Sequence, residues 1–221
     1  MMLSSKYRCL FVHIPKAAGQ SIEHFFLKHH NLSWKERAPL LLKYNPDPAK
    51  GPERLAHLTA AEYVQYGYMT RKELRTYFKF SFVRNPWARI VSEYNFAKYH
   101  QTMSFKDFVT NGRPTENSYS DAYRHVLPQY DFLHDDQGNL LVDFIGRFEN
   151  LQTDFNHVCS RLGFKETLLP RINVSTSDIL SNMLKRSNRS DYTEYYDAKT
   201  KRTIETVYQK DIQTFDYRFG E

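Results

Sequence analysis

Residues 8–26 have the sequence RCLFVHIPKAAGQSIEHFF, and this stretch decides the fold. Its first half contains a short apolar run of strand length, from Leu10 to Ile14, which ends at Pro15. After Gly19 the apolar residues recur at the spacing of a helix. The stretch therefore predicts a buried strand, a tight turn and a helix.

The turn between this strand and this helix has the composition of an anion-binding site. Backbone N–H groups at the start of a helix have no intrahelical partner and carry partial positive charge. Lys16 adds a full charge, Ser21 adds a hydroxyl group, and the small residues between them let the backbone approach a ligand closely. Because Lys16 precedes Gly19, the order is the reverse of a Walker A loop. The turn predicts a phosphate or sulfate site, and an ordinary turn with an exposed lysine is the alternative.

Residues 77–99 repeat this design with the sequence YFKFSFVRNPWARIVSEYNFAKY. An apolar strand is followed by Asn85, which can cap a helix, and by Pro86, which suits the first helical position. Arg84 then ends the strand and can offer a bidentate fork to a phosphate, while Ser92 lies about two turns into the helix and adds a hydroxyl group. The alternative for Arg84 is an ion pair with a neighbouring carboxylate.

His57 lies just before a capping box formed by Thr59 and Glu62, which predicts a helix from Ala60. A histidine in the turn before a helix can point into a cleft and accept a proton near neutral pH, as a general base must. The chain has nine histidines, so a surface or core role is the alternative for His57.

The length of 221 residues suits one α/β domain. We expect this domain to span residues 1–221 and to have a central parallel sheet flanked by helices. The net charge of +6 and the isoelectric point near 9.1 suit anionic ligands such as nucleotides or acidic glycans. Cys9 and Cys159 show neither a disulfide framework nor metal-ligand spacing, so we expect reduced core thiols. No apolar run approaches the roughly 18 residues of a membrane span, and we expect a cytoplasmic protein.

Together, HIPKAAGQS and RNPWARIVSEY resemble the two nucleotide signatures of sulfotransferases that use 3'-phosphoadenosine 5'-phosphosulfate (PAPS). The likeness is to the family 2 type, which includes glycan 2-O-sulfotransferases and bacterial relatives, and it implies the P-loop-like sulfotransferase fold. In that family the first motif binds the 5'-phosphosulfate and the second, R-N-P-x-x-R-x-x-S-x-Y, binds the 3'-phosphate.

Mapped by position, the resemblance implies contacts to the 3'-phosphate from Arg84 and Ser92. It implies that the 5' end is bound by Lys16, Ala17, Ala18, Gly19, Gln20 and Ser21. Gln20 departs from the family, where Thr is commoner. The HLTAAE stretch is similar to the family's H-x-T-A-x-E element, which implies that His57 is the base.

We therefore expect sulfuryl transfer from PAPS to an acceptor hydroxyl, in line and without a metal, with Lys16 neutralising charge on the leaving nucleotide. The expected acceptor is a carbohydrate, as a glycan or glycolipid. Glu23 and Glu62 are reserve candidates for the base, in place of His57. A P-loop-like kinase is an alternative, although it would need a Walker A lysine and metal-binding carboxylates. A second alternative is a non-catalytic module that binds a nucleotide or a nucleic acid. The leading hypothesis predicts no nucleic-acid partner.

The roles of several further segments and residues are left open by the sequence. Residues 113–139 are polar and aromatic, a candidate acceptor-binding insertion in which Arg124, His125 and Gln129 contact the acceptor or are solvated loop residues. Arg147 either approaches the nucleotide or forms a structural ion pair. Residues 170–177, with Ser175, resemble a family loop near the nucleotide, and the basic residues that follow are Lys185, Arg186 and Arg189. The sequence gives no indication of oligomeric state.

Overall fold

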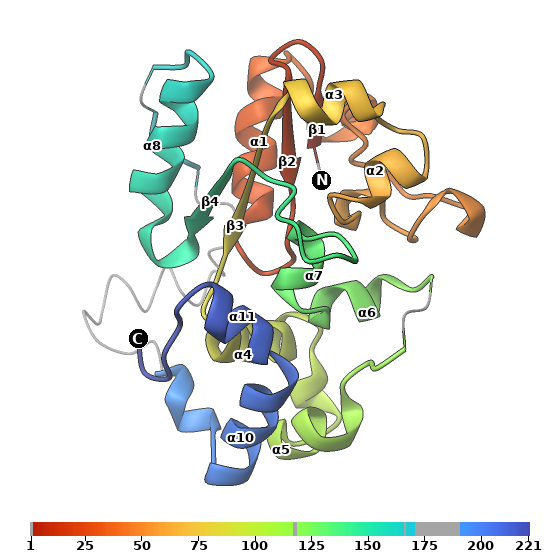
Figure 1. Ribbon diagram of the computed structural model, residues 1–221. Helices are drawn as coiled ribbons and strands as arrows, with labels where there is room; N and C mark the ends of the chain where they lie inside the picture. Colours follow the sequence, from red (N-terminus) through yellow and green to blue (C-terminus); the bar gives the residue numbers. More distant parts are fainter. Residues whose placement is uncertain (1, 117–118, 166, 171–190) are drawn as a thin grey trace.

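The computed structural model describes residues 2–116, 119–165, 167–170 and 191–221 (Figure 1). Its sheet has four strands in the order β1-β2-β3-β4, with bounds Met2–Ser4, Cys9–Val12, Phe78–Val83 and Phe144–Arg147. β2, β3 and β4 are parallel, and β1 pairs antiparallel with β2. The predicted α/β class with a parallel centre is confirmed, and β1 is an edge strand that the sequence did not predict.

The helices surround this sheet and fill the space beyond its carboxyl edge. They are α1 Gly19–His29, α2 Glu62–Gln65, α3 Arg71–Thr76, α4 Pro86–Phe96, α5 Phe105–Asp107, α6 Asp121–Val126, α7 Gln129–Leu133, α8 Leu151–Arg161, α10 Ala198–Val207 and α11 Gln209–Thr214. A 3₁₀ turn, η4, covers Leu55–His57, and a π-helical segment, η6, covers Phe108–Gly112.

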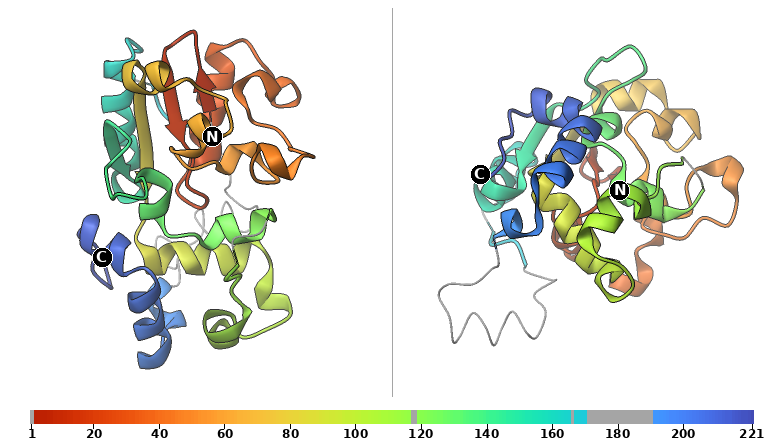
Figure 2. Two further views of the ribbon diagram at one scale, coloured as in Figure 1. Left: turned by 45° about the vertical axis from the view of Figure 1, so that its right-hand side comes forward. Right: turned by 90° about the horizontal axis from the view of Figure 1, so that it is seen from below.

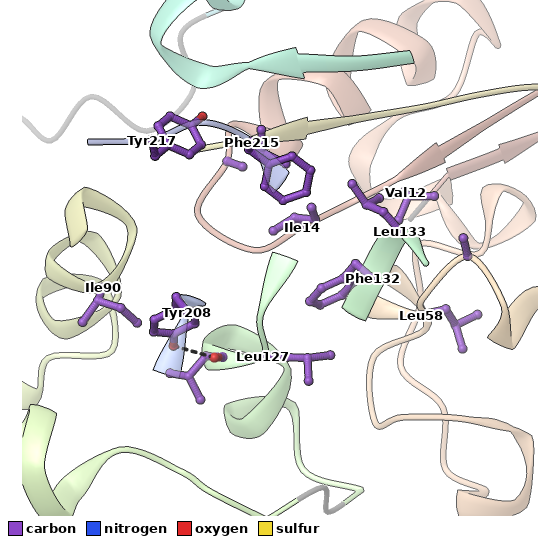
Figure 3. Close-up of a cluster of buried hydrophobic side chains, with 14 of the residues drawn as sticks. Val12, Ile14, Leu58, Ile90, Leu127, Phe132, Leu133, Tyr208, Phe215 and Tyr217 are labelled. Carbon is purple, nitrogen blue, oxygen red and sulfur yellow. Dashed lines mark hydrogen bonds between the residues drawn. The ribbon is translucent and has the colours of Figure 1, made fainter. Parts of the chain in front are cut away.

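Alternate residues of the strands face two separate hydrophobic clusters, as expected for a sheet covered on both sides. On one side Phe11 and Phe80 pack with residues of α1 and α8, including Phe26 and Phe155. On the other side Val12 faces a cluster that includes the residues labelled in Figure 3: Ile14, Leu58, Ile90, Leu127, Phe132, Leu133, Tyr208, Phe215 and Tyr217. Both predicted core thiols, Cys9 and Cys159, are buried and unbridged.

The register brings the carboxyl ends of the parallel strands to one edge, because Val12 pairs with Ser81 and Val83 pairs with Arg147. Figure 1 and the left view of Figure 2 both show α4, α5 and α10 gathered beyond this edge. Ligands of open α/β sheets bind outside the carboxyl ends of the strands. The turn after β2 and the β3–α4 junction therefore lie where a ligand site is expected.

Short-range capping signals are confirmed. The Asn85 side chain accepts hydrogen bonds from the N–H groups of Trp87 and Ala88 at 3.1 and 3.4 Å, and Pro86 begins α4. Thr59 and Glu62 form the predicted reciprocal hydrogen bonds at 2.8 and 3.4 Å. The helix behind them, α2, begins at Glu62, two residues later than the predicted start at Ala60.

Longer-range packing produces helices that the sequence pattern did not predict. The segment 113–139 contains α6 and α7, although its sequence shows little periodicity. The carboxylate of Asp211 accepts hydrogen bonds from the N–H groups of Gln129 and Tyr130 at 2.9 and 2.8 Å, which caps α7 from 82 residues away. The C-terminal helical segment is broken at Tyr208 into α10 and α11, and these pack against α4, α7 and η6.

The segment with Ser175, Lys185, Arg186 and Arg189 lies outside the described residues. Within the part of the chain that the structure describes, no helix has the length and apolar character needed to cross a membrane.

The packing of Gly19 against His13 generates a stability prediction. In Gly19→Ala the new Cβ would lie 1.9 Å from Nε2 of His13. The His13 ring is buried and held by Glu23 at 2.6 Å, so it cannot move aside. We expect Gly19→Ala to lower the free energy of unfolding by about 1–3 kcal/mol, the usual cost of overpacking a core. Thermal unfolding followed by circular dichroism measures this as a lower Tm.

Gly112→Ala is the matched control. Its new Cβ would meet Sδ of Met103 at 2.5 Å, but that atom belongs to a flexible side chain that can turn away. We expect this variant to lower the free energy of unfolding by less than about 1 kcal/mol. An equal fall in Tm for both variants would contradict the close packing assigned to Gly19.

Candidate active site

The turn after β2 presents backbone N–H groups in an arrangement that suits an anion. Lys16 and Ala18 both have left-handed conformations, with φ of 69° and 68°. Left-handed residues within a turn direct neighbouring N–H groups toward a common concavity, the geometry of an anion-binding nest. Local hydrogen bonds use the N–H groups of Ala17, to Ile14 at 3.3 Å, and of Ser21, to Ala18 at 3.1 Å. Among the described residues, the N–H groups of Ala18 and Gly19 have no acceptor and remain available to a ligand.

The guanidinium group of Arg89 holds this turn in place. Arg89 lies in α4 and is 1% exposed. Its Nε donates to the carbonyl of Pro15 at 3.0 Å, and its two Nη atoms donate to the carbonyls of Leu127 and His125 at 2.9 and 3.0 Å. The sequence analysis assigned no role to Arg89. The position of Arg89 between the apolar residues Ala88 and Ile90 was a signal that its side chain could be buried. A buried arginine needs several hydrogen-bond acceptors, so a structural role could have been predicted.

Arg84, at the end of β3, is directly beside the turn. Its Nη1 donates to the carbonyl of Lys16 at 3.2 Å, and its guanidinium carbon lies 4.2 Å from the centre of the Phe148 ring. The backbone of Arg84 is fixed by the amide of Gln129, which accepts from the N–H group and donates to the carbonyl, both at 2.8 Å. The structure therefore brings together the two predicted motifs, one around Lys16 and one around Arg84.

The side chain of Lys16 points toward α4. Its Nζ lies 3.4 Å from the centre of the Phe96 ring, a cation–π contact. Burial lowers the pKa of Lys16 to about 8; the charge of Glu93 opposes this change, and the charges of Arg84 and Arg89 add to it. Three cations are thus close together, which makes this region favourable for a multiply charged anion.

His57, at the end of η4, is buried and hydrogen-bonded to Asp121 of α6. Its Nδ1 lies 2.6 Å from Oδ1 of Asp121. Burial lowers the pKa of His57 to about 3, against the hydrogen bond and the charge of Asp121, so the ring is neutral at pH 7. Burial alone would raise the pKa of Asp121, but hydrogen bonds from His125 and His57 hold it well below its usual range. Asp121 is therefore a carboxylate, and a carboxylate only accepts hydrogen bonds.

Two more histidines adjoin His57. His125 lies between two carboxylates, with Nδ1 2.8 Å from Oε2 of Glu93 and Nε2 3.4 Å from Oδ2 of Asp121. Burial opposes a charge on His125, but the hydrogen bonds and charges of these carboxylates outweigh it and raise the pKa to about 9. The ring of His13 meets the ring of His57 edge-on, with centres 5.0 Å apart. The histidine rings of this cluster thus differ in charge at pH 7.

The cluster of His57, Asp121 and His125 could also bind a metal ion. Nitrogen and oxygen atoms of His57, Asp121 and His125 lie within 4.8 Å of one another, a spacing that can hold a metal. However, hydrogen bonds already join these atoms, and Nε of Arg54 lies 3.3 Å from Oδ2 of Asp121, where it adds positive charge. The sequence analysis did not foresee this group, and its expectation of a metal-free site stays a prediction.

The structure links His57 to the anion-binding turn through α4. The ring centres of His57 and His125 are 5.1 Å apart. Phe96 stacks on His125 with ring centres 5.8 Å apart and also contacts the ammonium group of Lys16. Ser92 lies in the same helix, about one turn before Phe96, and is half-buried. Its contact with a 3'-phosphate stays a prediction, as do the contacts of Gln20 and Ser21.

Several charged and polar residues have structural roles instead of the predicted ones. Arg124 and Gln129 are buried, so the prediction of solvated loop residues is wrong for both. Arg124 donates to both carboxylate oxygens of Glu62 at 2.9 and 2.7 Å, which ties up that reserve base. The other reserve base, Glu23, is paired with His13. Arg147 forms no ion pair among the described residues: its Nη2 donates to the carbonyl of Phe215 and its guanidinium group lies over the Tyr217 ring, so its approach to the nucleotide stays a prediction.

Comparison with known proteins agrees with this geometry. The model of the sulfotransferase family matches residues 1–218. An uncharacterized protein of Archaeoglobus fulgidus is 39% identical over 105 residues, which cover 46% of this chain and 81% of that protein. No solved structure matches the chain. Because the family model covers almost the whole chain and the sheet, the turn and the R-N-P junction lie together as the motifs require, this protein belongs to the sulfotransferase family, of the family 2 type.

Proposed function

We propose that this sulfotransferase moves the sulfuryl group of PAPS to a hydroxyl of a carbohydrate acceptor, a glycan or glycolipid, with His57 as the base. Membership of the family gives sulfuryl transfer in general. The choice of donor, acceptor and base is inferred from the site and from the family motifs. A carbohydrate is favoured because the motifs most resemble those of glycan sulfotransferases.

One observation carries this proposal, namely the contact between the two anion-binding motifs. Nη1 of Arg84 lies 3.2 Å from the carbonyl of Lys16, so the β2 turn and the end of β3 form one site. A nucleotide with phosphates on both its 3' and 5' positions offers an anion to each motif. The cations Lys16, Arg84 and Arg89 and the amides of Ala18 and Gly19 fit such a ligand better than one with a single phosphate.

The residues of the chain can be assigned to the steps of sulfuryl transfer. The neutral ring of His57 accepts the proton of the acceptor hydroxyl. The acceptor oxygen forms the new bond to sulfur as the bond between sulfur and the 5'-phosphate oxygen breaks. Lys16 neutralises the charge that remains on that oxygen of the departing nucleotide, 3'-phosphoadenosine 5'-phosphate (PAP). Arg84 and Ser92 bind the 3'-phosphate and contribute to affinity.

The two alternatives differ in the ligand that they require. A kinase would prefer ATP over PAP, and Mg²⁺ at its site would be held mainly by carboxylate and phosphate oxygens. The order of Lys16 and Gly19 does not support a Walker A loop. A nucleic-acid-binding module would prefer an oligonucleotide, and its affinity would fall steeply with salt.

The 3'-phosphate should dominate nucleotide affinity. We expect isothermal titration calorimetry to show PAP binding at least about tenfold more tightly than AMP, since a charge-assisted contact contributes about 1.5–3 kcal/mol. Arg84→Gln should remove most of this difference, whereas Arg75→Gln, in the exposed helix α3, should keep it. Equal affinities of the wild type for PAP and AMP would refute the proposed donor, and tighter binding of ATP or an oligonucleotide would favour the alternatives.

His57 should be needed for transfer and not for nucleotide binding. In His57→Asn the amide can still donate to Asp121, but no imidazole remains to take the acceptor proton. We expect transfer from radiolabelled PAPS to a carbohydrate panel to fall about 10²- to 10⁴-fold, with PAP affinity within threefold of wild type. His29→Asn, at a half-buried histidine at the end of α1 and outside the cluster, is the control. Full transfer by His57→Asn would remove His57 from the mechanism.

The depressed pKa of Lys16 predicts how nucleotide affinity changes with pH. A lysine with a pKa of about 8 loses its charge as pH rises through that value, while the phosphates of PAP are fully ionised above about pH 6–7. PAP affinity should therefore fall between pH 7 and pH 9. Lys16→Arg keeps its charge over this range and should lose most of the dependence. Calorimetry at pH 7 and pH 9 measures the PAP affinity of the wild type and of Lys16→Arg. A wild-type affinity that does not change with pH would contradict the contact assigned to Lys16.

A further inference from the structure

Two hydrogen bonds and one longer ion pair connect His57 with Asp121, His125 and Glu93, so that four side chains from three elements form a continuous series. Nδ1 of His57 meets Oδ1 of Asp121 at 2.6 Å, Oδ2 of Asp121 faces Nε2 of His125 at 3.4 Å, and Nδ1 of His125 meets Oε2 of Glu93 at 2.8 Å. His57 ends η4, Asp121 and His125 belong to α6, and Glu93 belongs to α4. Bases and acids alternate along this series.

Asp121 determines which nitrogen of His57 carries the hydrogen. A carboxylate accepts and cannot donate, so the short contact requires the hydrogen on Nδ1 of His57. The lone pair of the neutral ring is then on Nε2, the atom that can accept a proton. A histidine without such a partner populates both tautomers, and only one of them has Nε2 available as a base.

His125 and its neighbours keep Asp121 in this orientation. Both nitrogens of His125 face carboxylates, so both can donate. Oδ2 of Asp121 also faces Nε of Arg54 at 3.3 Å, and the N–H group of Asp121 donates to Glu53 at 3.2 Å. With each carboxylate oxygen engaged, rotation of Asp121 would break contacts on both sides. The orientation of the Asp121 carboxylate toward His57 is therefore fixed by its other contacts.

The chain of contacts ends in the helix that contacts Lys16. Glu93 and Phe96 lie three residues apart in α4 and face the same cluster, since His125 is hydrogen-bonded to Glu93 and stacked on Phe96. Phe96 also contacts the ammonium group of Lys16. The helix thus sets the position of the base relative to the lysine that would contact the leaving nucleotide.

We propose that Asp121 and His125 are positioning residues, which hold His57 in the tautomer with its lone pair on Nε2 and, through Glu93, at a fixed place relative to helix α4. This inference rests on the proposed function of His57 as the base. Neither residue touches the reacting atoms in this account. Their effect on transfer is exerted through His57.

Other charged groups around His57 must be included in any dependence on pH. His13, at the end of β2, meets its ring edge-on, and Glu23 of α1 pairs with His13 and interacts electrostatically with His57. Arg54 and Glu53 face Asp121 from the segment before η4. The positive charges of His13 and His125, when present, lower the pKa of His57, and Asp121 raises it.

Nitrogen-15 NMR of histidine-labelled protein tests the geometry without any catalysis. At pH 7 the long-range ¹H–¹⁵N spectrum should show His57 as a neutral ring protonated on Nδ1, and His125 as a ring protonated on both nitrogens. Asp121→Asn should shift His57 toward the other tautomer, because an amide can donate to Nδ1 as well as accept from it. A wild-type His57 protonated on Nε2, or a neutral His125 in the wild type, would overturn the proposal.

Kinetics test the effect on transfer. Asp121→Asn should lower kcat about 10²- to 10⁴-fold, as loss of a base or of its tautomer does, with the KM for PAPS within threefold. Asp143→Asn, whose carboxylate pairs with Lys79 outside this cluster, should leave both quantities unchanged.

The proposal fails if Asp121→Asn keeps wild-type kcat, or if it weakens PAP binding as much as it slows transfer, since the latter is the behaviour of a merely structural residue. Failure of the proposed function is a different result: full transfer by His57→Asn would exclude the base, while the NMR spectra would still report the tautomer of His57.

Discussion

The buried guanidinium group of Arg89 is the interaction on which both sides of the site depend. It donates to carbonyls of the β2 turn and of the α6–α7 segment, at Pro15, His125 and Leu127. A buried charge costs several kcal/mol unless its hydrogen bonds are satisfied, so burial of Arg89 holds both the β2 turn and the α6–α7 segment against α4. One of its acceptors precedes Lys16 directly and another is the backbone of His125. A single side chain therefore fixes the spacing between the anion-binding turn and the histidine cluster.

Helix α4 contacts both a cationic side of the site and the histidine cluster for which we propose proton transfer. Lys16 and Arg84 make the first side favourable for phosphate groups, and His57 with Asp121 makes the second able to take a proton. Carboxylates beside an anion site would normally repel the ligand. His125, whose pKa is raised to about 9 by its two carboxylate partners, offsets part of that negative charge while leaving His57 neutral. In the proposed mechanism, the same cluster can thus lie close to a multiply charged nucleotide and still supply a base.

What the sequence predicted correctly depends on contacts between near neighbours. Asn85 caps α4, and Thr59 and Glu62 form their capping box, because in each case the partner residues lie within four positions. The predicted strand before Pro15 is present as β2, but it ends at Val12, two residues before Ile14. The family resemblance rested on two such local motifs and is confirmed. The three residues of β1 are too few to form a pattern. Asp121, which lies 64 residues from His57, and Asp211, which caps α7 from 82 residues away, make contacts that leave no periodic signal in the chain.

The central claim is that one doubly phosphorylated nucleotide spans the β2 turn and the end of β3. A crystal structure of the complex with PAP tests this most directly. The account predicts the 5'-phosphate within hydrogen-bond distance of the amides of Ala18 and Gly19 and of Nζ of Lys16, and the 3'-phosphate against Arg84 and Ser92. A nucleotide bound with Arg84 and Lys16 contacting the same phosphate, or bound away from both side chains, would contradict it.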